Sequence, residues 1–436
     1  MAANEVELLR HIFDTAVAAA QPAVCLPPAL PDPPRGRTVV VGAGKAAAAM
    51  AAALEDSWPG PAEKLSGLVV TRYGFARPTR RIEVVEASHP VPDAAGLTAA
   101  QRILDAVSDL TPDDLVIALI SGGGSALLTL PAPGITLADK QAVTDALLRS
   151  GADIGEINTV RKQLSAIKGG RLAEAAHPAH VATLAISDVV GDDPATIASG
   201  PTVADRSRPA DAEAVLARYG IDPPQAVRAH LASAADAPRG PGTIISGVSG
   251  LGGADYRIIA NGPAAIAAAE TEAHRCVDYP VHVIDNAATG EAREVARTHA
   301  AYANRAPGEI PQGPVLFLSG GELTVTLKGS GRGGPNTEYL LALALAVQET
   351  GGEPWAVHAL ACDTDGVDGS EDNAGALLTP DTLARAAAAG LDGQALLDNN
   401  DACGFFEALG DLVVTGATGT NVNDFRALLL RPPPSR

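Results

Sequence analysis

The stretch TVVVGAGKAAAAM, residues 38–50, reads as an apolar strand, a glycine turn and an alanine-rich helix in direct succession. LVIALISGGGSALL, residues 115–128, repeats this order. Short apolar runs that end in glycine, each followed by an Ala/Leu segment of helical length, recur along the chain and are typical of an α/β fold. Because these runs are continuous rather than alternating, we expect sheets that are covered on both faces.

The same pattern predicts where the regular elements lie. The expected strands are 38–41, 67–71, 82–88, 115–120, 181–187, 256–260, 281–285, 315–319, 356–362 and 411–416. Helices are expected to begin near Glu5, Ala46, Ala95, Thr136, Asn158, Asp211, Pro263, Thr289, Thr337 and Pro380.

Length and composition favour more than one domain. The chain has 436 residues, and domains of about 150 residues predict two or three of them. A stretch rich in Pro, Ala and Gly at 222–243 is the best candidate for a boundary. We therefore expect an N-terminal domain over 1–240 and a C-terminal domain over 241–436.

Charge and composition exclude several classes of partner. The 51 acidic and 32 basic residues give a net charge of -19, which repels nucleic acid and anionic membranes, and only 3% of the residues are aromatic. The sequence shows neither a secretory signal nor an apolar run of about 18 residues, so we expect a cytoplasmic protein without a membrane partner. The four cysteines form no Cys-x-x-Cys pair and are expected to be reduced thiols.

The turn at residues 42–47 has a G-x-G-x-x-A pattern, which fits the loose dinucleotide-binding fingerprint. The acid that an NAD site needs about 20 residues further on is absent, although Arg72 there suits the 2′-phosphate of NADP. Lys45 lies inside the turn, where a cation opposes the helix macrodipole unless an anion is bound. A tight structural turn with a solvated lysine is the alternative interpretation.

A second glycine turn follows the strand at 115–120. Its residues are Ser121, Gly122, Gly123, Gly124 and Ser125. Consecutive glycines let backbone N–H groups converge on phosphate oxygens, although the pattern is not a Walker A loop. A purely structural turn stays open.

The run NTVRKQLSAIKGGRLAE at 158–174 carries Arg161, Lys162, Lys168 and Arg171 before its first acid. Arg161 and Lys168 are seven positions apart and are expected to share one face of a helix. Such a cluster suits an anionic substrate, a carboxylate or a phosphate. The alternative is a solvated helix face whose charges are paired with neighbouring acids.

Three acids follow the expected strand at 181–187. Asp188 comes directly after it, and Asp192 and Asp193 precede Pro194. Carboxylates at a strand end near phosphate-type loops are typical Mg²⁺ ligands, whereas Asp192 and Asp193 are also suited to starting a turn of helix.

The C-terminal half offers further polar candidates. Arg332 lies between glycines before an expected helix and suits a carboxylate or phosphoryl group. The cluster of Asp363, Asp365 and Asp368 lacks the spacing of a calcium loop. The segment 421–424 holds polar residues that suit turns as well as ligands, and His89, before a proline, reads as a packing residue.

These residues together resemble one family. The motifs VVVGAGKAA, SHPVPD, LISGGGSALL, NTVRKQLSAIKGGRLA, ISDVVGDDPATIASGPT, SGGELTVTLKGSGRGGPNTE, CDTDGVDG and TGATGTNVND occur in the order of the class II glycerate 2-kinases, often labelled hydroxypyruvate reductases. The resemblance covers about residues 5–428. It implies a Rossmann-like N-terminal domain, a C-terminal α/β domain of the family's leucine-rich type at about 313–428, and an active-site cleft between them.

The resemblance also implies a reaction and its residues. The reaction is phosphorylation of the 2-hydroxyl of D-glycerate by ATP with Mg²⁺, which gives 2-phosphoglycerate and ADP. The family's motif lysine and arginine fall on Lys45 and Arg332, which would hold substrate and transfer phosphoryl. The implied nucleotide contacts are Ser121, Gly122, Gly123, Gly124, Ser125, Gly320, Gly321, Glu322, Thr420 and Asn421. Asp188 would be a catalytic residue and, with Asp192, a Mg²⁺ ligand, while Arg161 and Lys168 would contact substrate.

Three motif positions depart from the family pattern. Pro335 and Thr337 stand where other members carry Arg and Gln, and Ala417 stands where they carry Pro. Pro335 in place of Arg removes a second cation near Arg332, and this loss could alter the preference for substrate.

Two other functions remain open from the sequence. One is an NADPH-dependent hydroxypyruvate reductase, and the other is an anion-binding regulatory protein without turnover. For the kinase the expected partners are a small-molecule substrate and a nucleotide, and the sequence leaves a homodimer open.

Overall fold

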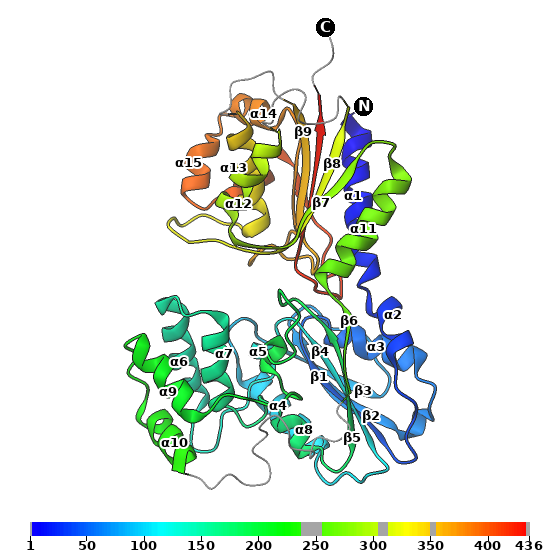
Figure 1. Cartoon of the computed structure of the whole chain (residues 1–436), viewed down its shortest axis with the longest axis vertical. Coiled ribbons are helices and arrows are strands. Elements are labelled where there is room, and N and C mark those ends of the chain that lie inside the picture. The colour runs from blue at the N-terminus through cyan, green and yellow to red at the C-terminus, as the bar shows by residue number, and fades with distance from the viewer. Residues whose placement is uncertain (1, 237–254, 304–312, 349–354, 433–436) are drawn as a thin grey trace. The chain divides into compact units, whose positions relative to one another are not determined.

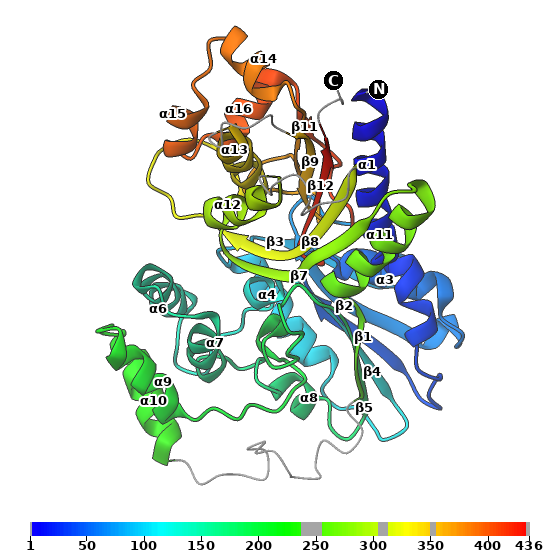
Figure 2. The same ribbon diagram turned by 45° about the horizontal axis from the view of Figure 1, so that its top comes forward.

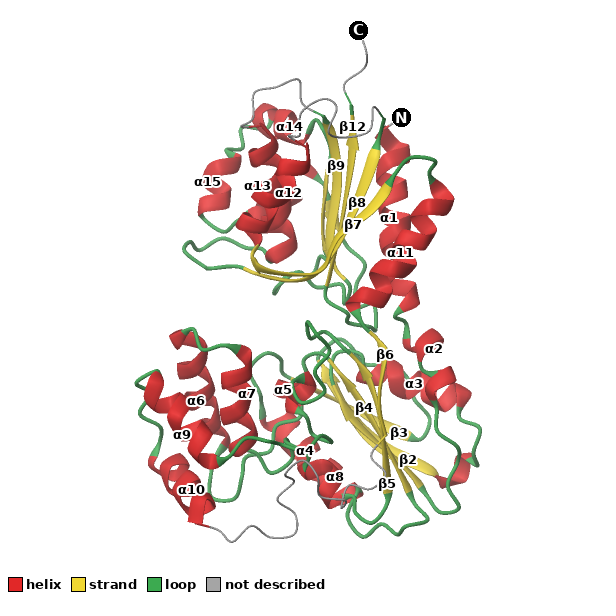
Figure 3. Ribbon diagram, in the orientation of Figure 1, coloured by secondary structure: helices red, strands yellow, loops and turns green. Residues whose placement is uncertain are grey.

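The chain forms two compact units, each built around one six-stranded sheet with helices on both faces (Figures 1 and 3). One unit is Pro22–Ile259, and the other joins Met1–Gln21 to Ala260–Arg436. The expected two α/β domains are thereby confirmed, although the division predicted at residue 240 falls outside the described residues. The computed structural model describes residues 2–236, 255–303, 313–348 and 355–432.

The sheet of the unit Pro22–Ile259 has the strand order β3-β2-β1-β4-β5-β6. Its strands are β1 (Thr38–Ala43), β2 (Leu65–Arg72), β3 (Ile82–Ala87), β4 (Leu115–Ser121), β5 (His180–Ile186) and β6 (Asp255–Ala260). All pairings among β1 to β5 are parallel. This is the strand order of the doubly wound dinucleotide-binding fold, in which the winding reverses between β1 and β4 and ligands bind beyond the carboxyl ends of those strands.

The two central strands, β1 and β4, approach each other closely because glycine stands at the contact. A Cβ atom added at Gly42 would lie 2.1 Å from the carbonyl oxygen of Leu119 on β4. Every residue of both strands is buried, as the continuous apolar runs predict. The glycine at this position is therefore required by the packing of the sheet itself.

Helices cover both faces of this sheet, with α3 on one face and α4 on the other (Figure 2). The helices of the unit are α2 (Pro22–Cys25), α3 (Ala47–Ser57), α4 (Ala94–Ala106), α5 (Gly124–Leu127), α6 (Leu137–Ser150), α7 (Ile154–Gln163), α8 (Arg171–Ala175), α9 (Pro209–Arg218) and α10 (Gln225–Asp236). Single 3₁₀ turns occur at Pro27–Ala29, Ala62–Lys64 and Ile197–Ser199.

Helices α6, α7, α9 and α10 gather beside the sheet around an apolar core of their own. Both α6 and α7 begin with a reciprocal capping box, Thr136 with Asp139 and Asp153 with Glu156. In each box the cap side chain accepts a backbone N–H of the first turn, and the acid accepts the N–H of the cap residue. These local signals fix where both helices start, and α6 and α7 carry the basic residues discussed below.

The second unit has a mixed sheet with the order β11-β10-β9-β12-β8-β7. Its strands are β7 (Val281–Glu291), β8 (Val315–Thr324), β9 (Ala356–Asp363), β10 (Gly375–Leu378), β11 (Leu412–Val413) and β12 (Asp424–Arg431). Strand β12 is antiparallel to both of its neighbours, β8 and β9, and β7 is parallel to β8.

Two layers of helix enclose the second sheet. Helices α1 and α11 lie side by side on one face, and α12 and α13 cover the other (Figure 1). Its helices are α1 (Ala2–Ala19), α11 (Gly262–Cys276), α12 (Ala292–Ala303), α13 (Pro335–Gln348), α14 (Thr382–Ala388), α15 (Gly393–Asp398) and α16 (Ala402–Leu409). The first helix of the chain thus packs on the C-terminal sheet, against β9 and β12.

Several sequence expectations are wrong in detail. Strand β12 is missing from the predicted strands, because DFRALLLR has no β-branched residue and becomes a strand only through its pairing with β8 and β9. The helix expected near Thr289 begins three residues later, at Ala292, because Thr289 still belongs to β7. The stretch 222–243, the candidate domain boundary, contains α10 up to residue 236, and its last part lies outside the described residues. No described helix is long and apolar enough to cross a membrane.

Replacement of Gly42 tests the close approach of β1 and β4. Gly42→Ala is expected to lower the free energy of unfolding by about 3 kcal/mol, because an added methyl group overpacks the contact with β4. Urea unfolding followed by circular dichroism measures the effect. The control is Gly313→Ala, where an added Cβ meets no atom within 4 Å. Equal unfolding midpoints for the two variants would contradict the proposed packing role.

Candidate functional site

The carboxyl edge of the first sheet carries most of the predicted site. The loops after β1, β3, β4 and β5 hold Lys45, His89, the turn 121–125 and Asp188 in that order. Because the strands are parallel, their carboxyl ends meet at one edge of the sheet. The turns after β1 and β4 are neighbours at the point where the winding reverses, which is where this fold binds ligands.

The two glycine turns are joined by hydrogen bonds. The backbone N–H of Lys45 donates to the carbonyl oxygen of Gly122 at 2.8 Å. The N–H of Ala46 donates to Oγ of Ser121 at 3.0 Å. These bonds hold the start of α3 against the end of β4, so the Lys45 turn and the 121–125 turn form one structural piece.

The side chains of Lys45 and His89 meet over Gly123. A Cβ atom built at Gly123 would lie 3.1 Å from Cδ2 of His89 and 3.3 Å from Cγ of Lys45. Lys45 is half-buried there. His89 was expected to be a packing residue, yet it lies beside the predicted catalytic lysine. The signal in the sequence was its position in SHPVPD, directly after the parallel strand β3.

The dinucleotide interpretation of residues 42–47 does not fit this geometry. The N–H groups of Gly44, Lys45 and Ala46 donate to Val70 O, Gly122 O and Ser121 Oγ, all within the protein. A pyrophosphate would need such N–H groups at the helix N-terminus. Arg72, the candidate for a 2′-phosphate, lies over the ring of Phe75 with its Cζ 5.5 Å from the centroid. The pattern is therefore a structural turn that carries a half-buried lysine.

Ser125, at the end of the second turn, is fixed by a chain of polar side chains. Its hydroxyl is 2.9 Å from that of Ser199, which donates to Oδ1 of Asn158 at 3.0 Å. Ser199 has a φ of +60°, in the left-handed region that non-glycine residues rarely adopt. Strain of this kind persists only where surrounding contacts enforce it, so the SGPT motif acts as a support for the 121–125 turn.

The basic run at 158–174 is not one helix face. Helix α7 ends at Gln163, so the expectation that Arg161 and Lys168 share a helical face is wrong. Lys168 is fully buried and donates from Nζ to the carbonyl oxygen of Leu128 at 2.8 Å. Lys162 pairs with Asp205 at 2.9 Å, as the alternative interpretation of paired charges predicts. Burial lowers the pKa of Lys168 and also that of Arg161.

The acids after β5 take different roles. Asp188 is half-buried two residues beyond the strand, and Asp192 is half-buried with a φ of +55°. Asp193 accepts hydrogen bonds from Ala195 N–H and Thr196 Oγ1, so it is a turn-starting residue. Asp188 and Asp192 offer carboxylate oxygens at the edge of the sheet, which is the donor type that Mg²⁺ prefers.

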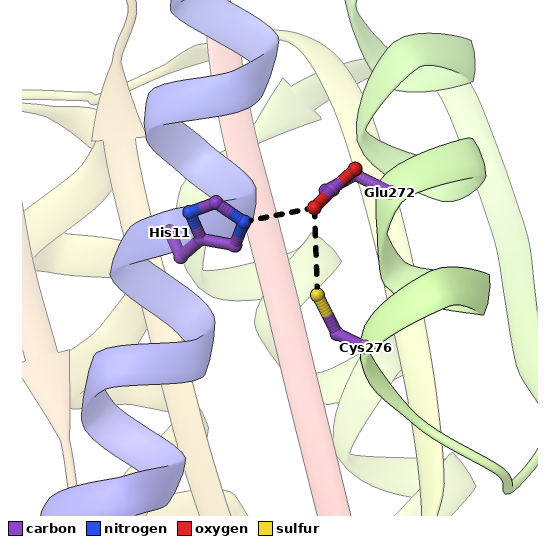
Figure 4. A group of neighbouring side chains, drawn as sticks. All are labelled: His11, Glu272 and Cys276. Carbon is purple, nitrogen blue, oxygen red and sulfur yellow. Dashed lines mark hydrogen bonds and ion pairs between the residues drawn. The ribbon is translucent and has the colours of Figure 1, made fainter.

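One group of three potential metal ligands occurs among the described residues, and it lies elsewhere. His11 of α1 and Glu272 and Cys276 of α11 have ligand atoms within 4.8 Å of one another (Figure 4). His11 Nε2 is 3.0 Å from Glu272 Oε1, and this hydrogen bond lowers the pKa of Glu272. His11 and Cys276 are exposed. The group links two helices at the surface.

Arg332 lies on the loop between β8 and α13 of the second unit, with its side chain 53% exposed. Its guanidinium pairs with Glu371 at 3.1 Å and Glu407 at 2.5 Å. The hydrogen bond that the guanidinium donates to Glu407 is the main reason that the pKa of Arg332 is raised. The loop itself is held by a bond from Arg332 N–H to Asp401 Oδ1 at 3.1 Å. Two carboxylates thus orient this arginine.

Asp368 caps the helix that follows Arg332. Its fully buried carboxylate accepts from the N–H groups of Asn336 and Thr337, each at 2.9 Å, and from Thr337 Oγ1 at 2.8 Å. Burial raises its pKa to about 6. Thr337, one of the departures from the family pattern, thereby contributes a bond to the cap. Of the three acids at 363, 365 and 368, Asp368 therefore serves as the structural cap of α13.

The remaining predicted nucleotide contacts lie in or near strands. Gly320 and Gly321 belong to β8, and a Cβ at Gly321 would lie 2.2 Å from the carbonyl oxygen of Ala288. Thr420 is buried and donates to the carbonyl oxygen of Ala20 at 2.7 Å. The other two residues are Glu322, which is exposed, and Asn421, which is buried. For these residues nucleotide binding stays a prediction.

A buried polar network ties β12 to the start of α13, and sequence reasoning missed it. Arg426 is fully buried, pairs with Asp424 at 2.6 Å and donates to Gly320 O at 3.0 Å. Asp424 also accepts from Nδ2 of Asn336 at 2.7 Å. Asp424 was read as a turn residue or ligand because β12 was not expected. The network fixes the start of α13, which directly follows the loop that carries Arg332.

The predicted residues fall in both units. Lys45, the 121–125 turn, Arg161, Asp188 and Asp192 belong to Pro22–Ile259. Arg332, with Gly320, Gly321, Glu322, Thr420 and Asn421, belongs to the other unit. The structure brings Lys45 together with Gly122 and Gly123. The joint action of Lys45 and Arg332, and the cleft that the resemblance implies, stay predictions.

Comparison with known proteins matches both halves of the chain to family models. A domain of unknown function, DUF4147, matches residues 8–232, and the MOFRL family matches residues 315–424. The chain is 53% identical to a protein of Agrobacterium vitis that carries the provisional name hydroxypyruvate reductase, over 97% of this chain and 94% of that protein.

Glycerate kinases are also similar over most of the chain. The D-glycerate 2-kinase of Thermotoga maritima is 38% identical over 89% of each protein. A crystal structure of glycerate kinase from Thermotoga maritima superposes with a TM-score of 0.82 at 36% identity, covering 98% of this chain and 99% of that one. The chain, which matches both the DUF4147 and the MOFRL models, belongs to the glycerate 2-kinase family.

Proposed function

We propose that this protein is a D-glycerate 2-kinase, which transfers the γ-phosphoryl group of ATP to the 2-hydroxyl of D-glycerate and releases 2-phosphoglycerate and ADP. The observation that carries the proposal is the joined pair of turns at the winding reversal, where Lys45 lies against the glycine turn 121–125. Relatives named glycerate kinase and D-glycerate 2-kinase support the same activity.

Phosphoryl transfer depends mainly on positioning and on neutralising the charge of the migrating group. Lys45 is suited to this role because its ammonium is carried on a half-buried side chain at the start of α3, where an anion is also favoured by the helix dipole. Arg332 is the second proposed cation, oriented by Glu371 and Glu407. A bound phosphoryl group would compete with these two acids for the guanidinium.

The turn 121–125 is the proposed cradle for the nucleotide phosphates, with Gly320, Gly321, Glu322, Thr420 and Asn421 as further nucleotide contacts. Asp188 and Asp192 are the proposed Mg²⁺ ligands, and their half-buried carboxylates fit that ion. Mg²⁺ would supply charge neutralisation on the phosphate oxygens. Arg161 is the better placed of the two proposed substrate contacts, because Nζ of Lys168 already bonds Leu128 O.

A hydroxypyruvate reductase is the second candidate, and the name of the Agrobacterium vitis relative favours it. The use of the N–H groups of residues 44–46 within the protein disfavours a dinucleotide at the expected turn. The cytoplasmic location and a homodimer stay predictions.

A coupled assay decides between the two functions. The purified protein is incubated with D-glycerate, ATP and Mg²⁺, followed by enolase and pyruvate kinase without any mutase, so that only 2-phosphoglycerate yields pyruvate. We expect pyruvate. Formation of ADP without pyruvate would mean that the phosphoryl group is transferred to another position of glycerate or to another acceptor. NADPH oxidation by hydroxypyruvate in the absence of ADP formation would overturn the kinase.

Removal of the Lys45 ammonium tests its role. Lys45→Ala is expected to lower turnover by about 10³-fold, because a positioned cation that stabilises developing charge contributes on this scale. The fold should survive, as judged by an unchanged unfolding midpoint. The control is Lys64→Ala, whose exposed Nζ bonds the carbonyl oxygen of Arg35 outside the turn. Near-normal turnover of Lys45→Ala would remove Lys45 from the mechanism.

A change at Asp188 tests the metal assignment. Asp188→Asn is expected to raise the Mg²⁺ concentration for half-maximal activity about tenfold or more, since a neutral amide is a weaker ligand than a carboxylate. Activity is titrated with Mg²⁺ at saturating ATP. The matched control is Asp113→Asn, an exposed carboxylate that precedes β4 and so lies at the opposite edge of the same sheet. The same Mg²⁺ dependence in both variants would exclude Asp188 from the metal site.

A further inference from the structure

A pocket of about 190 Å³ opens beside the last residue of the 121–125 turn. Its wall includes Ser125, Thr129 from the chain after α5, Lys140 from α6, Arg161 from α7 and the segment Pro90–Pro92. The pocket lies entirely within the unit Pro22–Ile259. Lys140 was not singled out by the sequence, because it is a lone lysine in an otherwise ordinary amphipathic helix.

Two polar atoms of this wall are buried without a hydrogen-bond partner among the described residues. They are Nζ of Lys140 and Oγ1 of Thr129, and their side chains are 6% and 0% exposed. Lysine is almost never buried unless it is paired, and each buried polar group without a partner costs free energy. Two such groups on one pocket wall indicate a binding surface for a polar ligand.

The charges around Lys140 specify the sign of that ligand. Burial lowers the pKa of Lys140 to about 7, and repulsion from Arg161 and Arg171 adds to the effect. Lys168 is also repelled by Lys140 and Arg161. The acid on the pocket wall is Asp145, which is exposed. Cations therefore dominate the buried part of the pocket.

The other charged groups near α6 are engaged elsewhere. Lys162 of α7 pairs with Asp205, and Arg171 is attracted by Asp205 and Glu174. On α10, which also packs against α6, His230 bonds the carbonyl oxygen of Gln163 and Arg228 pairs with Asp222.

We propose that this pocket binds a small oxyanion, a carboxylate or a phosphate, through the Lys140 ammonium, the Arg161 guanidinium and the Thr129 hydroxyl. The anion supplies the partner that Lys140 and Thr129 lack within the described parts of the chain and relieves the repulsion among the cations. Ser125 belongs both to this wall and to the turn that carries the proposed reaction. The carboxylate of D-glycerate is the expected source, and this part rests on the proposed function.

Proton uptake is a distinctive property of such a site. Near pH 7 a fraction of the free protein carries Lys140 in its neutral form, and a bound anion favours the ammonium form. Binding therefore takes up protons. The affinity for D-glycerate should fall as the pH rises from about 6 to about 8, because the pKa of Lys140 lies between these values.

Isothermal titration calorimetry of the full-length protein, with D-glycerate and inorganic phosphate in separate titrations, tests the proposal. Lys140→Met is expected to weaken binding of the oxyanion by about tenfold or more and to abolish proton uptake, measured in two cationic buffers of different ionisation enthalpy. The control is Arg149→Met, which removes one charge from an exposed position of the same helix. Unchanged affinity in Lys140→Met would overturn the proposal.

Stability separates a binding role from a structural one. A lysine kept for binding destabilises the free protein, so Lys140→Met should unfold at the same urea concentration as the parent or a higher one. Thr129→Val, which keeps the shape and removes the hydroxyl, should also retain stability and weaken binding severalfold. If both variants lose stability while binding is unchanged in Thr129→Val, the two residues are structural and the proposal fails.

The identity of the bound anion is tested separately from the proposed kinase reaction. Binding of D-glycerate that phosphate displaces, and that Lys140→Met loses, identifies the carboxylate site. Lys140-dependent binding of phosphate alone supports the oxyanion site with a phosphate source. Either result stands even if the coupled assay yields no 2-phosphoglycerate, whereas failure of both anions to bind overturns the proposal whatever the assay shows.

Discussion

The contact between β1 and β4 is the constraint on which the first unit depends. Gly42 lets the two strands approach, and bonds from Lys45 N–H and Ala46 N–H to Gly122 O and Ser121 Oγ join the turns that follow them. The glycine pattern at residues 42–47, which resembles a dinucleotide fingerprint, here joins two strands and the two turns that follow them. A lysine and a glycine turn are thereby held at the place where doubly wound sheets bind ligands.

In the second unit, buried charged and polar side chains hold a strand and a helix together. Arg426, Asp424 and Asn336 are buried together and connect the central strand β12 to the start of α13, where Asp368 caps the helix. Breaking one partner of such a network would leave a buried charge uncompensated, at a cost of about 3–5 kcal/mol. The Arg332 side chain itself lies on the loop outside this network and is 53% exposed.

The basic residues show how a single cluster in sequence separates in space. Lys162 and Asp205 form an ordinary ion pair, and Lys168 is sealed against Leu128 O. Arg161 instead faces a pocket that it shares with Lys140, some twenty positions away in the chain. A spacing argument could not show this division, because it assumed that α7 continues beyond Gln163. The groups that these basic residues contact or adjoin come from loops and from α6.

The sequence alone predicts the α/β class, sheets that are covered on both faces and the order of motifs that marks the family, because continuous apolar runs and glycine turns are local features. It also indicated Lys45 and the 121–125 turn. The folded chain was needed to show that Gly42 serves strand packing, that β12 is a central strand and that Nζ of Lys140 has no hydrogen-bond partner among the described residues. Each of these depends on what another segment places beside the residue, and a single chain read in order does not contain that information.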